Sequence, residues 1–185
     1  MRLKSALRRG VAAAVIAGVV VSSGIPAYAG TWDIANGDIT VKGASDESGN
    51  YNKVKQGDKD FEKDEGETVI TGESDKNTVT IDTSGGKVDV TFDDLKIDAS
   101  DKGKAAVRVE GGHDATIELD GDNKLKSGSH NAGLEKNGNE SSGKLTIKDD
   151  NDTKGSLTAK GGEGGGAGIG GGIKSTGSSI TIRGG

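Results

Sequence analysis

The sequence contains no cysteine, and proline and aromatic residues are nearly absent. One of the 185 residues is Pro, and aromatic residues make up 3% of the chain. Without cysteine, no disulfide can supply the stability that many small secreted domains obtain from crosslinks. With so few aromatic residues, a single thick core would lack the large side chains that usually fill it. This composition leaves two options, a disordered chain or a fold built from many thin apolar layers.

Long hydrophobic runs are also missing, apart from one short run near the start. The chain opens with the basic stretch "MRLKSALRRG", continues with the apolar stretch "VAAAVIAGVVV", and then places small residues at Ala27 and Ala29. This order is typical of a secretory signal peptide cleaved before Gly30. The apolar stretch has roughly half of the ~20 residues that a membrane-spanning helix needs. We therefore expect residues 1–29 to be removed, the protein to be secreted or on the cell surface, and no transmembrane anchor.

Basic residues are outnumbered by acidic ones, and the imbalance grows once the leader is removed. The formal charge of the chain is −5, and loss of the four leader cations would make it −9. An acidic secreted protein repels nucleic acid and anionic lipid. We expect no nucleic-acid partner, and partners that are neutral, cationic or reached through bound cations.

A recurring apolar–polar–apolar triplet is the main pattern that the sequence does contain. It appears in the runs "TVTID", "VDVTFDD", "AVRVEGG", "ATIELDGD", "KLTIKDD" and "SITIRGG". A period of two residues indicates strands with one buried side and one wet side. Gly, Asn, Asp and Ser separate the runs, and no sustained helical period follows Gly30. The pattern argues against disorder and predicts an all-β protein.

The strand runs recur at intervals that indicate a repeat. Apolar positions match from Val90 to Ile117, from Ile117 to Leu145 and from Leu145 to Ile180, which are 27, 28 and 35 residues apart. Repeats of this size built from short strands favour a solenoid. We predict a right-handed parallel β-helix with short strands and Gly-rich turns, with a β-sandwich as the alternative.

The repeat also suggests how the chain is divided. Residues 30–67 carry little of the triplet pattern and are expected to form an irregular N-terminal capping segment, with an excursion or loose turn over 45–66. Residues 68–185 are expected to form the coils. The chain stops at "ITIRGG" without a polar cap. Because solenoids need capped ends, a truncated C-terminus and an unusual cap both remain open.

The stretch "GGEGGGAGIGGG", residues 161–172, has three interpretations. A phosphate-binding loop is disfavoured because no helix pattern follows it and Ile173 stands where a Walker-type loop needs its second Gly. A flexible linker stays open as an alternative. Since Ala167 and Ile169 keep the alternating pattern, we predict a tight corner at which neighbouring coils approach closely.

Several segments resemble a known group of proteins. "TWDIANGDITV", "ATIELDGDNKLKSGSHNAGLEKNG", "LTAKGGEGGGAGIGGG" and "SITIRGG" are similar to segments of secreted β-helix surface proteins of Gram-positive bacteria known as carbohydrate-binding domain-containing proteins. The resemblance covers most of residues 31–185. It implies tandem β-helix coils and calcium-assisted binding of cell-wall polysaccharide.

Acidic turns supply candidate calcium ligands, because calcium binds six to eight hard oxygens. If coils stack, turns from successive coils could converge on one ion. The alternative is that these side chains are solvated and only shape their turns. The candidate residues are Asp120, Asp122, Asp149, Asp150 and Asp152.

Trp32 and Tyr51 are the candidate sugar-binding residues, since an aromatic face can pack against the C–H surface of a sugar ring. For Trp32 the alternative is that it covers the open N-terminal end of the coils. The sequence has no cysteine nucleophile and no serine elbow motif, and both histidines stand in turn-like contexts. We therefore predict no enzymatic activity.

The expected function is that of a secreted, non-catalytic carbohydrate-binding or adhesion module that recognises cell-wall or mucosal polysaccharide with the help of calcium. Two other functions stay open. One is a structural stalk that spaces other domains. The other is a β-helix polysaccharide lyase, for which Arg108 or Arg183 would supply the basic group beside the substrate.

Overall fold

The protein is all-β in the computed structural model, which describes residues 30–64 and 66–184. The predicted signal peptide, with Ala27 and Ala29, lies outside the described residues. Within the described part, helix is limited to the 3-10 turn η1 (Ile34–Asn36), and no helix there is long and apolar enough to cross a membrane.

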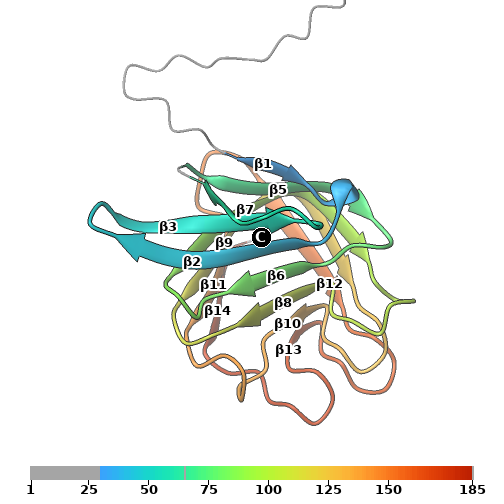
Figure 1. Ribbon diagram of the computed structural model, residues 1–185. Helices are drawn as coiled ribbons and strands as arrows, with labels where there is room; N and C mark the ends of the chain where they lie inside the picture. Colours follow the sequence, from blue (N-terminus) through green and yellow to red (C-terminus); the bar gives the residue numbers. More distant parts are fainter. Residues whose placement is uncertain (1–29, 65, 185) are drawn as a thin grey trace, which may run out of the picture.

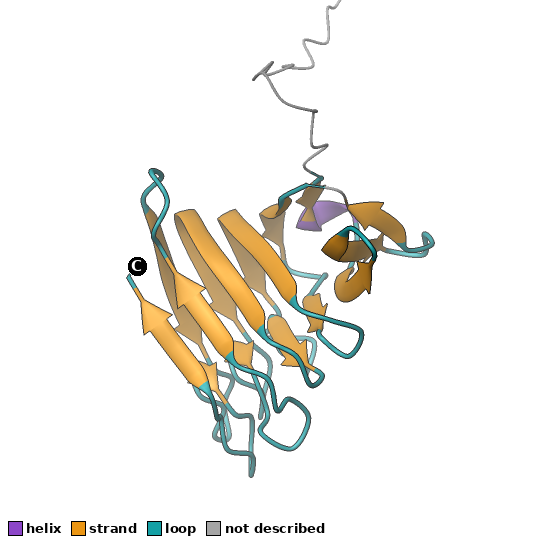
Figure 2. Cartoon of the chain, turned by 90° about the vertical axis from the view of Figure 1, so that its left-hand side faces the viewer, coloured by secondary structure: helices purple, strands orange, loops and turns teal. Residues whose placement is uncertain are grey.

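The strands form two seven-stranded sheets (Figure 1). The first sheet contains, in spatial order, β1 (Thr31–Asp33), β5 (Thr68–Ser74), β7 (Val88–Asp98), β9 (Ala115–Lys126), β11 (Leu145–Lys148) and β14 (Ile180–Arg183), and β12 (Gly155–Lys160) also pairs with β9. The second sheet contains β13 (Ile169–Gly170), β10 (Leu134–Glu135), β8 (Val107–Glu110), β6 (Val79–Asp82), β2 (Ile39–Asp46), β3 (Gly49–Gln56) and β4 (Glu62–Asp64). Figure 2 shows the C-terminal strand at the opposite end of the stack from η1.

The chain alternates between the two sheets from β5 to β11, and each strand pairs in parallel with a strand from a distant segment. Val90 pairs with Ile117 and Leu145 pairs with Ile180, as predicted. The third predicted match is wrong by two residues, because Ile117 pairs with Ile147 and Leu145 pairs with Ala115. A shift of two residues keeps the same side of the strand facing inward, so the predicted pattern of buried and exposed positions is still correct.

The first sheet is parallel throughout, the second mixes parallel and antiparallel pairs, and neither closes on itself. Among the described strand pairs, antiparallel pairing is confined to β2 with β3 and β3 with β4. The facing antiparallel layers of a β-sandwich therefore do not describe most of the structure. The β2–β3 hairpin projects beyond the neighbouring strands in Figure 1.

Residues 45–66 contain two strands, where the sequence indicated an excursion or loose turn. The inward positions of β3 include Asn52 and Gln56, which are polar and therefore hid the alternating pattern. Their amides find partners inside the fold: Asn52 Nδ2 donates to the backbone oxygen of Asp89 at 2.7 Å, and Gln56 Nε2 donates to that of Asp33 at 2.6 Å. Hydrogen bonding of this kind offsets the desolvation of a buried amide.

The core consists of aliphatic rows that run across the strands. One row of the first sheet stacks Ile70, Phe92 and Leu119, with Trp32 at its N-terminal end. The matching row of the second sheet stacks aliphatic side chains from β2, β6 and β8. Apart from β7 and β9, which add five and four, no described strand adds more than two buried apolar side chains, and nearly all of them are aliphatic. Thin rows of this kind explain how a chain with 3% aromatic residues still forms a dry core.

The glycine-rich stretch packs backbone against backbone. A Cβ atom on Gly162 would lie 1.9 Å from the carbonyl oxygen of Gly128, and one on Gly166 would lie 1.9 Å from that of Asn131. The segment also makes ordered backbone bonds, such as Leu134 N to Gly168 O at 3.0 Å. Neighbouring turns therefore approach so closely that they have no room for a side chain, as the tight-corner interpretation predicts.

Lys136 is a fully buried lysine directly after β10. Its Nζ donates to the backbone oxygens of Ser141 and Ser178, each at 2.9 Å. Burial lowers the pKa of Lys136, and the negative charge of Asp114 opposes that shift. The amine ties the turn after β10 to the segment before β14.

The buried amine of Lys136 predicts a pH dependence of stability. An unperturbed lysine has a pKa of about 10.4. Because the pKa of Lys136 is lowered on folding, the folded protein releases the proton of its ammonium group at a lower pH than the unfolded chain does. The buried ammonium group of Lys136 therefore destabilises the fold below the folded-state pKa, and this effect fades as the pH rises toward 10.4. Urea unfolding should show the wild type gaining stability relative to Lys136→Met between pH 7 and 10. Lys59→Met, which removes an exposed side chain, should track the wild type, and a constant gap for Lys136→Met would contradict the prediction.

Candidate functional site

A polar groove of about 580 Å³ lies between the β3 strand and the outward side of the first sheet. Its floor comes from β7, β9 and β11, and its wall comes from the β2–β3 hairpin and the segment before β5. The lining residues are Asn50, Tyr51, Asn52, Gly66, Glu67, Lys87, Asp89, Val90, Thr91, Thr116, Glu118, Lys148, Asp150 and Asn151.

The floor of the groove carries polar side chains in two rows, because β7, β9 and β11 pair in parallel and in register. One row crosses the three strands at Thr91, Glu118 and Lys148. The second row runs beside it through Asp89 and Thr116. Adjacent strands in a sheet are about 4.8 Å apart, so hydroxyl, carboxylate and ammonium groups are presented at a fixed spacing.

Tyr51 stands at the wall of this groove and comes from β3, opposite Ala44 of β2. The ring is half-buried, and Lys63 Nζ lies 4.4 Å from its centroid. Lys53 Nζ lies 6.0 Å from the same ring. Cation–π contacts of this kind help to orient an aromatic ring. Tyr51 is thus the predicted sugar-binding residue that the structure places in a groove.

Trp32, the other predicted sugar-binding residue, lies elsewhere. It continues the inward row above Ile70 and packs against the core while half-buried. Its Nε1 donates to Asp64 Oδ2 at 3.1 Å. Trp32 does not line the groove, and its position matches the alternative in which it covers the N-terminal end of the apolar rows.

Ion pairs fix the charged side chains of the groove. Lys148 Nζ lies 2.7 Å from Glu118 Oε2 and 2.5 Å from Asp150 Oδ1. Hydrogen bonds to Asp150 and Glu118 raise the pKa of Lys148, so the ammonium stays charged in neutral solution. Lys87 pairs with Asp89 at 2.9 Å. With Glu67, the described lining residues include four carboxylates and two ammonium groups, and the groove is therefore acidic.

The predicted calcium ligands bind separate partners. Asp122 pairs with Lys124 at 2.7 Å, and Asp149 Oδ1 accepts a hydrogen bond from Gly155 N at 3.2 Å. Asp120 Oδ1 accepts from Asn151 Nδ2 at 2.8 Å, Asp150 pairs with Lys148, and Asp152 is exposed. Within residues 30–64 and 66–184, no three His, Cys, Asp or Glu side chains are grouped so that they could hold a metal ion. As positioned, the five carboxylates do not fit a single calcium site.

Asp93 lies near two other carboxylates. It pairs across the ladder with Asp120 and precedes Asp94. Burial raises the pKa of Asp93, and the charges of Asp94 and Asp120 raise it further. Three like charges at one corner of the first sheet repel one another.

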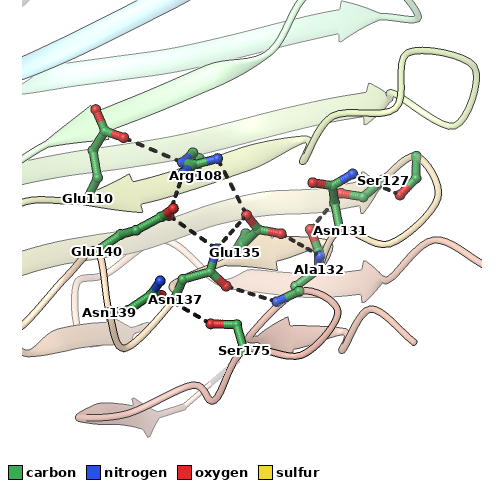
Figure 3. Close-up of polar contacts among 12 residues, drawn as sticks. Arg108, Glu110, Ser127, Asn131, Ala132, Glu135, Asn137, Asn139, Glu140 and Ser175 are labelled. Atoms are coloured by element: carbon green, nitrogen blue, oxygen red, sulfur yellow. Dashed lines mark hydrogen bonds and ion pairs between the residues drawn. The ribbon is translucent and has the colours of Figure 1, made fainter. Parts of the chain in front are cut away.

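Arg108, the basic residue considered for a lyase, is surrounded by carboxylates (Figure 3). Its Nε lies 3.4 Å from Glu110, its Nη1 lies 3.7 Å from Glu135, and its Nη2 contacts Glu140. Glu135 is 2% exposed, and a Cβ atom on Gly172 would lie 2.6 Å from its Oε2. A lyase would need the positive charge of Arg108 to bind an acidic sugar. The three carboxylates around the guanidinium group offset that charge.

Most groove residues carried no signal in the sequence. Glu118 and Lys148 stand at ordinary polar positions of the strand runs, 30 residues apart, and only the ladder brings them together. Tyr51 and Asp150 were the two that sequence analysis singled out. Comparison of the chain with protein-family models, curated proteins and solved structures finds no match.

Proposed function

We propose that the protein is a secreted, non-catalytic module that binds cell-wall or mucosal glycan along the groove beside Tyr51. In this proposal the two sheets are faces of one right-handed parallel β-helix, and the β2–β3 hairpin forms one wall of the binding site. The alternation of strands between the sheets supports this interpretation.

One observation carries the proposal: the aromatic ring of Tyr51 stands at the wall of the groove, beside a floor of regularly spaced polar side chains from β7, β9 and β11. Tyr51 offers a ring that can pack against the C–H surface of a sugar. The accessible side chains of Asp89 and Thr116 on the floor offer acceptors and donors for sugar hydroxyl groups. Because the floor is a rigid ladder, little side-chain ordering is needed on binding, which favours affinity.

The negative charge of the groove favours neutral glycans over acidic ones. Four carboxylates and two lysines line it, so an acidic polysaccharide would be repelled at close range. Neutral glycans such as glucans, mannans or N-acetylglucosamine polymers fit this charge. Calcium assistance stays part of the proposal as expected from the sequence, and the titration with calcium and with a chelator tests it.

Tyr51→Ala should weaken glycan binding about tenfold, because removal of one buried aromatic contact costs about 1.4 kcal/mol. Tyr51→Phe should retain most of the affinity, since the ring face is kept. The measurement is isothermal titration of the protein with neutral oligosaccharides, repeated with calcium and with a chelator.

Phe61→Ala is the control for this experiment. Phe61 is an aromatic residue that is 44% exposed and does not line the groove, so its removal should leave affinity unchanged. Equal losses for Phe61→Ala and Tyr51→Ala would place binding outside the groove. No heat with any glycan, with or without calcium, would leave the structural stalk as the function.

A further inference from the structure

Asp64 is a buried carboxylate that has no cationic partner among residues 30–64 and 66–184. Its side chain is 4% exposed. Its oxygens accept four hydrogen bonds: Oδ2 from Trp32 Nε1 at 3.1 Å and Thr68 Oγ1 at 3.0 Å, and Oδ1 from the backbone nitrogens of Gly30 at 3.1 Å and Gly66 at 3.4 Å. Buried carboxylates are rarely found without a paired cation.

Gly30 is held against Asp64 by its surroundings. Its carbonyl oxygen accepts a hydrogen bond from Val69 N at 3.0 Å, which continues the pairing of β1 with β5. A Cβ atom at position 30 would lie 2.5 Å from Asp64 Oδ2 and 2.6 Å from Trp32 Nε1. Only glycine fits there without displacing these groups, and its nitrogen faces the carboxylate.

The sequence predicts that a signal peptidase hydrolyses the bond between Ala29 and Gly30. In that step the bond between the carbonyl carbon of Ala29 and the nitrogen of Gly30 breaks. The oxygen of water bonds to the carbonyl carbon, which gives a carboxylate on Ala29, and both protons of water go to the nitrogen, which gives an ammonium group on Gly30. The neutral N–H donor at 3.1 Å from Asp64 would thereby become a cation in the same place.

We propose that the α-ammonium group of processed Gly30 forms a partly buried ion pair with Asp64 and that export processing thereby locks the N-terminal end of the fold. The inference rests on the proposed secretion of the protein and does not depend on glycan binding. The bond from Gly30 N to the carboxylate is already assisted by one charge, and a charge on the donor adds direct Coulombic attraction. The pair would fasten β1, Trp32 and β4 together at the end of the apolar rows.

Within residues 30–64 and 66–184, the charged side chains next to this pair have other partners. Lys63, the neighbour of Asp64 on β4, directs its Nζ to Asp46 at 3.3 Å and over the Tyr51 ring. Glu67, which precedes β5, has its carboxylate bound by the hydroxyl of Thr91. Gly66 and Thr68 contribute neutral donors only.

The test compares two forms of the processed chain, residues 30–185, which includes every residue that the structure describes. One form has a free amine at Gly30, and the other is acetylated there, which restores the neutral N–H of the uncleaved chain. At pH 6 the ratio of folded to unfolded protein in urea should be at least about tenfold higher for the free amine.

The difference should depend on pH with a defined sign. A cation that gains a partner on folding contributes its stability below its unfolded pKa, about 7.7–8.0 for an α-amino group, and loses that contribution as the pH rises beyond the folded value. The gap between the two forms should therefore close at alkaline pH. In an Asp64→Asn background, the gap should be absent at every pH.

Equal stability of the two forms at pH 6 would overturn the inference, as would a gap that persists in Asp64→Asn. Mass spectrometry of the protein exported from a secreting host adds an independent check, because a first residue other than Gly30 would also overturn it. Glycan titration of both forms then tests the binding proposal separately. Binding without a stability gap would refute only the ion pair, and a gap without binding would refute only the glycan proposal.

Discussion

Replacing Gly162 with alanine is expected to lower the free energy of unfolding by about 3 kcal/mol, the upper range for an overpacked site. The added Cβ would lie 1.9 Å from the carbonyl oxygen of Gly128, 2.3 Å from its carbonyl carbon and 2.7 Å from the nitrogen of Ser129. All three atoms belong to the backbone, so no side chain can rotate away. The turn must shift, and with it the bond from Gly162 N to Asn131 O at 3.0 Å.

Gly112→Ala is the control for this substitution. The nearest atom to a Cβ on Gly112 is Ser142 Oγ at 3.6 Å, an ordinary contact. Alanine also restricts the unfolded chain, so Gly112→Ala should be neutral or stabilising by up to about 1 kcal/mol. Urea unfolding followed by circular dichroism measures both variants. Identical midpoints would show that the turns of the glycine-rich stretch are not in close contact.

Replacing Asp64 with alanine is expected to lower the free energy of unfolding by about 4 kcal/mol, because it leaves several buried donors without an acceptor. Trp32 Nε1 and Thr68 Oγ1 both lose their bond to Oδ2, and Gly30 N loses its bond to Oδ1. The end of the first sheet would then be held mainly by the short β1–β5 pairing.

Asp60→Ala removes an exposed carboxylate from the same part of the chain and should change stability by less than about 0.5 kcal/mol. Tryptophan fluorescence offers a local readout beside urea unfolding, since Trp32 is the one tryptophan. In Asp64→Ala its emission should shift toward that of a solvated indole before global unfolding. A variant with wild-type midpoint and emission would contradict the role assigned to Asp64.

The two substitutions test different means of stabilising a chain without disulfides. Gly162 allows turns from successive repeats to touch, so that backbone hydrogen bonds run along the stack. Asp64 gathers the first residues of the described chain onto β4 and β5. One acts by the absence of a side chain and the other by a buried charge, and neither adds apolar area to the core.

Sequence alone determined the all-β class, the triplet strands and two of the three repeat intervals. These features are local, because alternation in a strand shows directly which side is buried. The close contacts of the glycine-rich corner also followed from composition, since only glycine permits such an approach. The interval from Ile117 was misjudged by two residues because Leu145 and Ile147 have the same character and face the same side.

Tertiary structure decided the rest, since the partners come from segments far apart in the chain. Asn52 and Gln56 face inward because backbone oxygens of β7 and β1 accept their hydrogen bonds, which no local pattern reveals. Lys136 is buried for the same reason. The aspartates of the acidic turns bind separate partners, so their spacing in sequence could not predict a site. The groove beside Tyr51 exists only where the hairpin meets three strands in register, and that register is a property of the folded ladder.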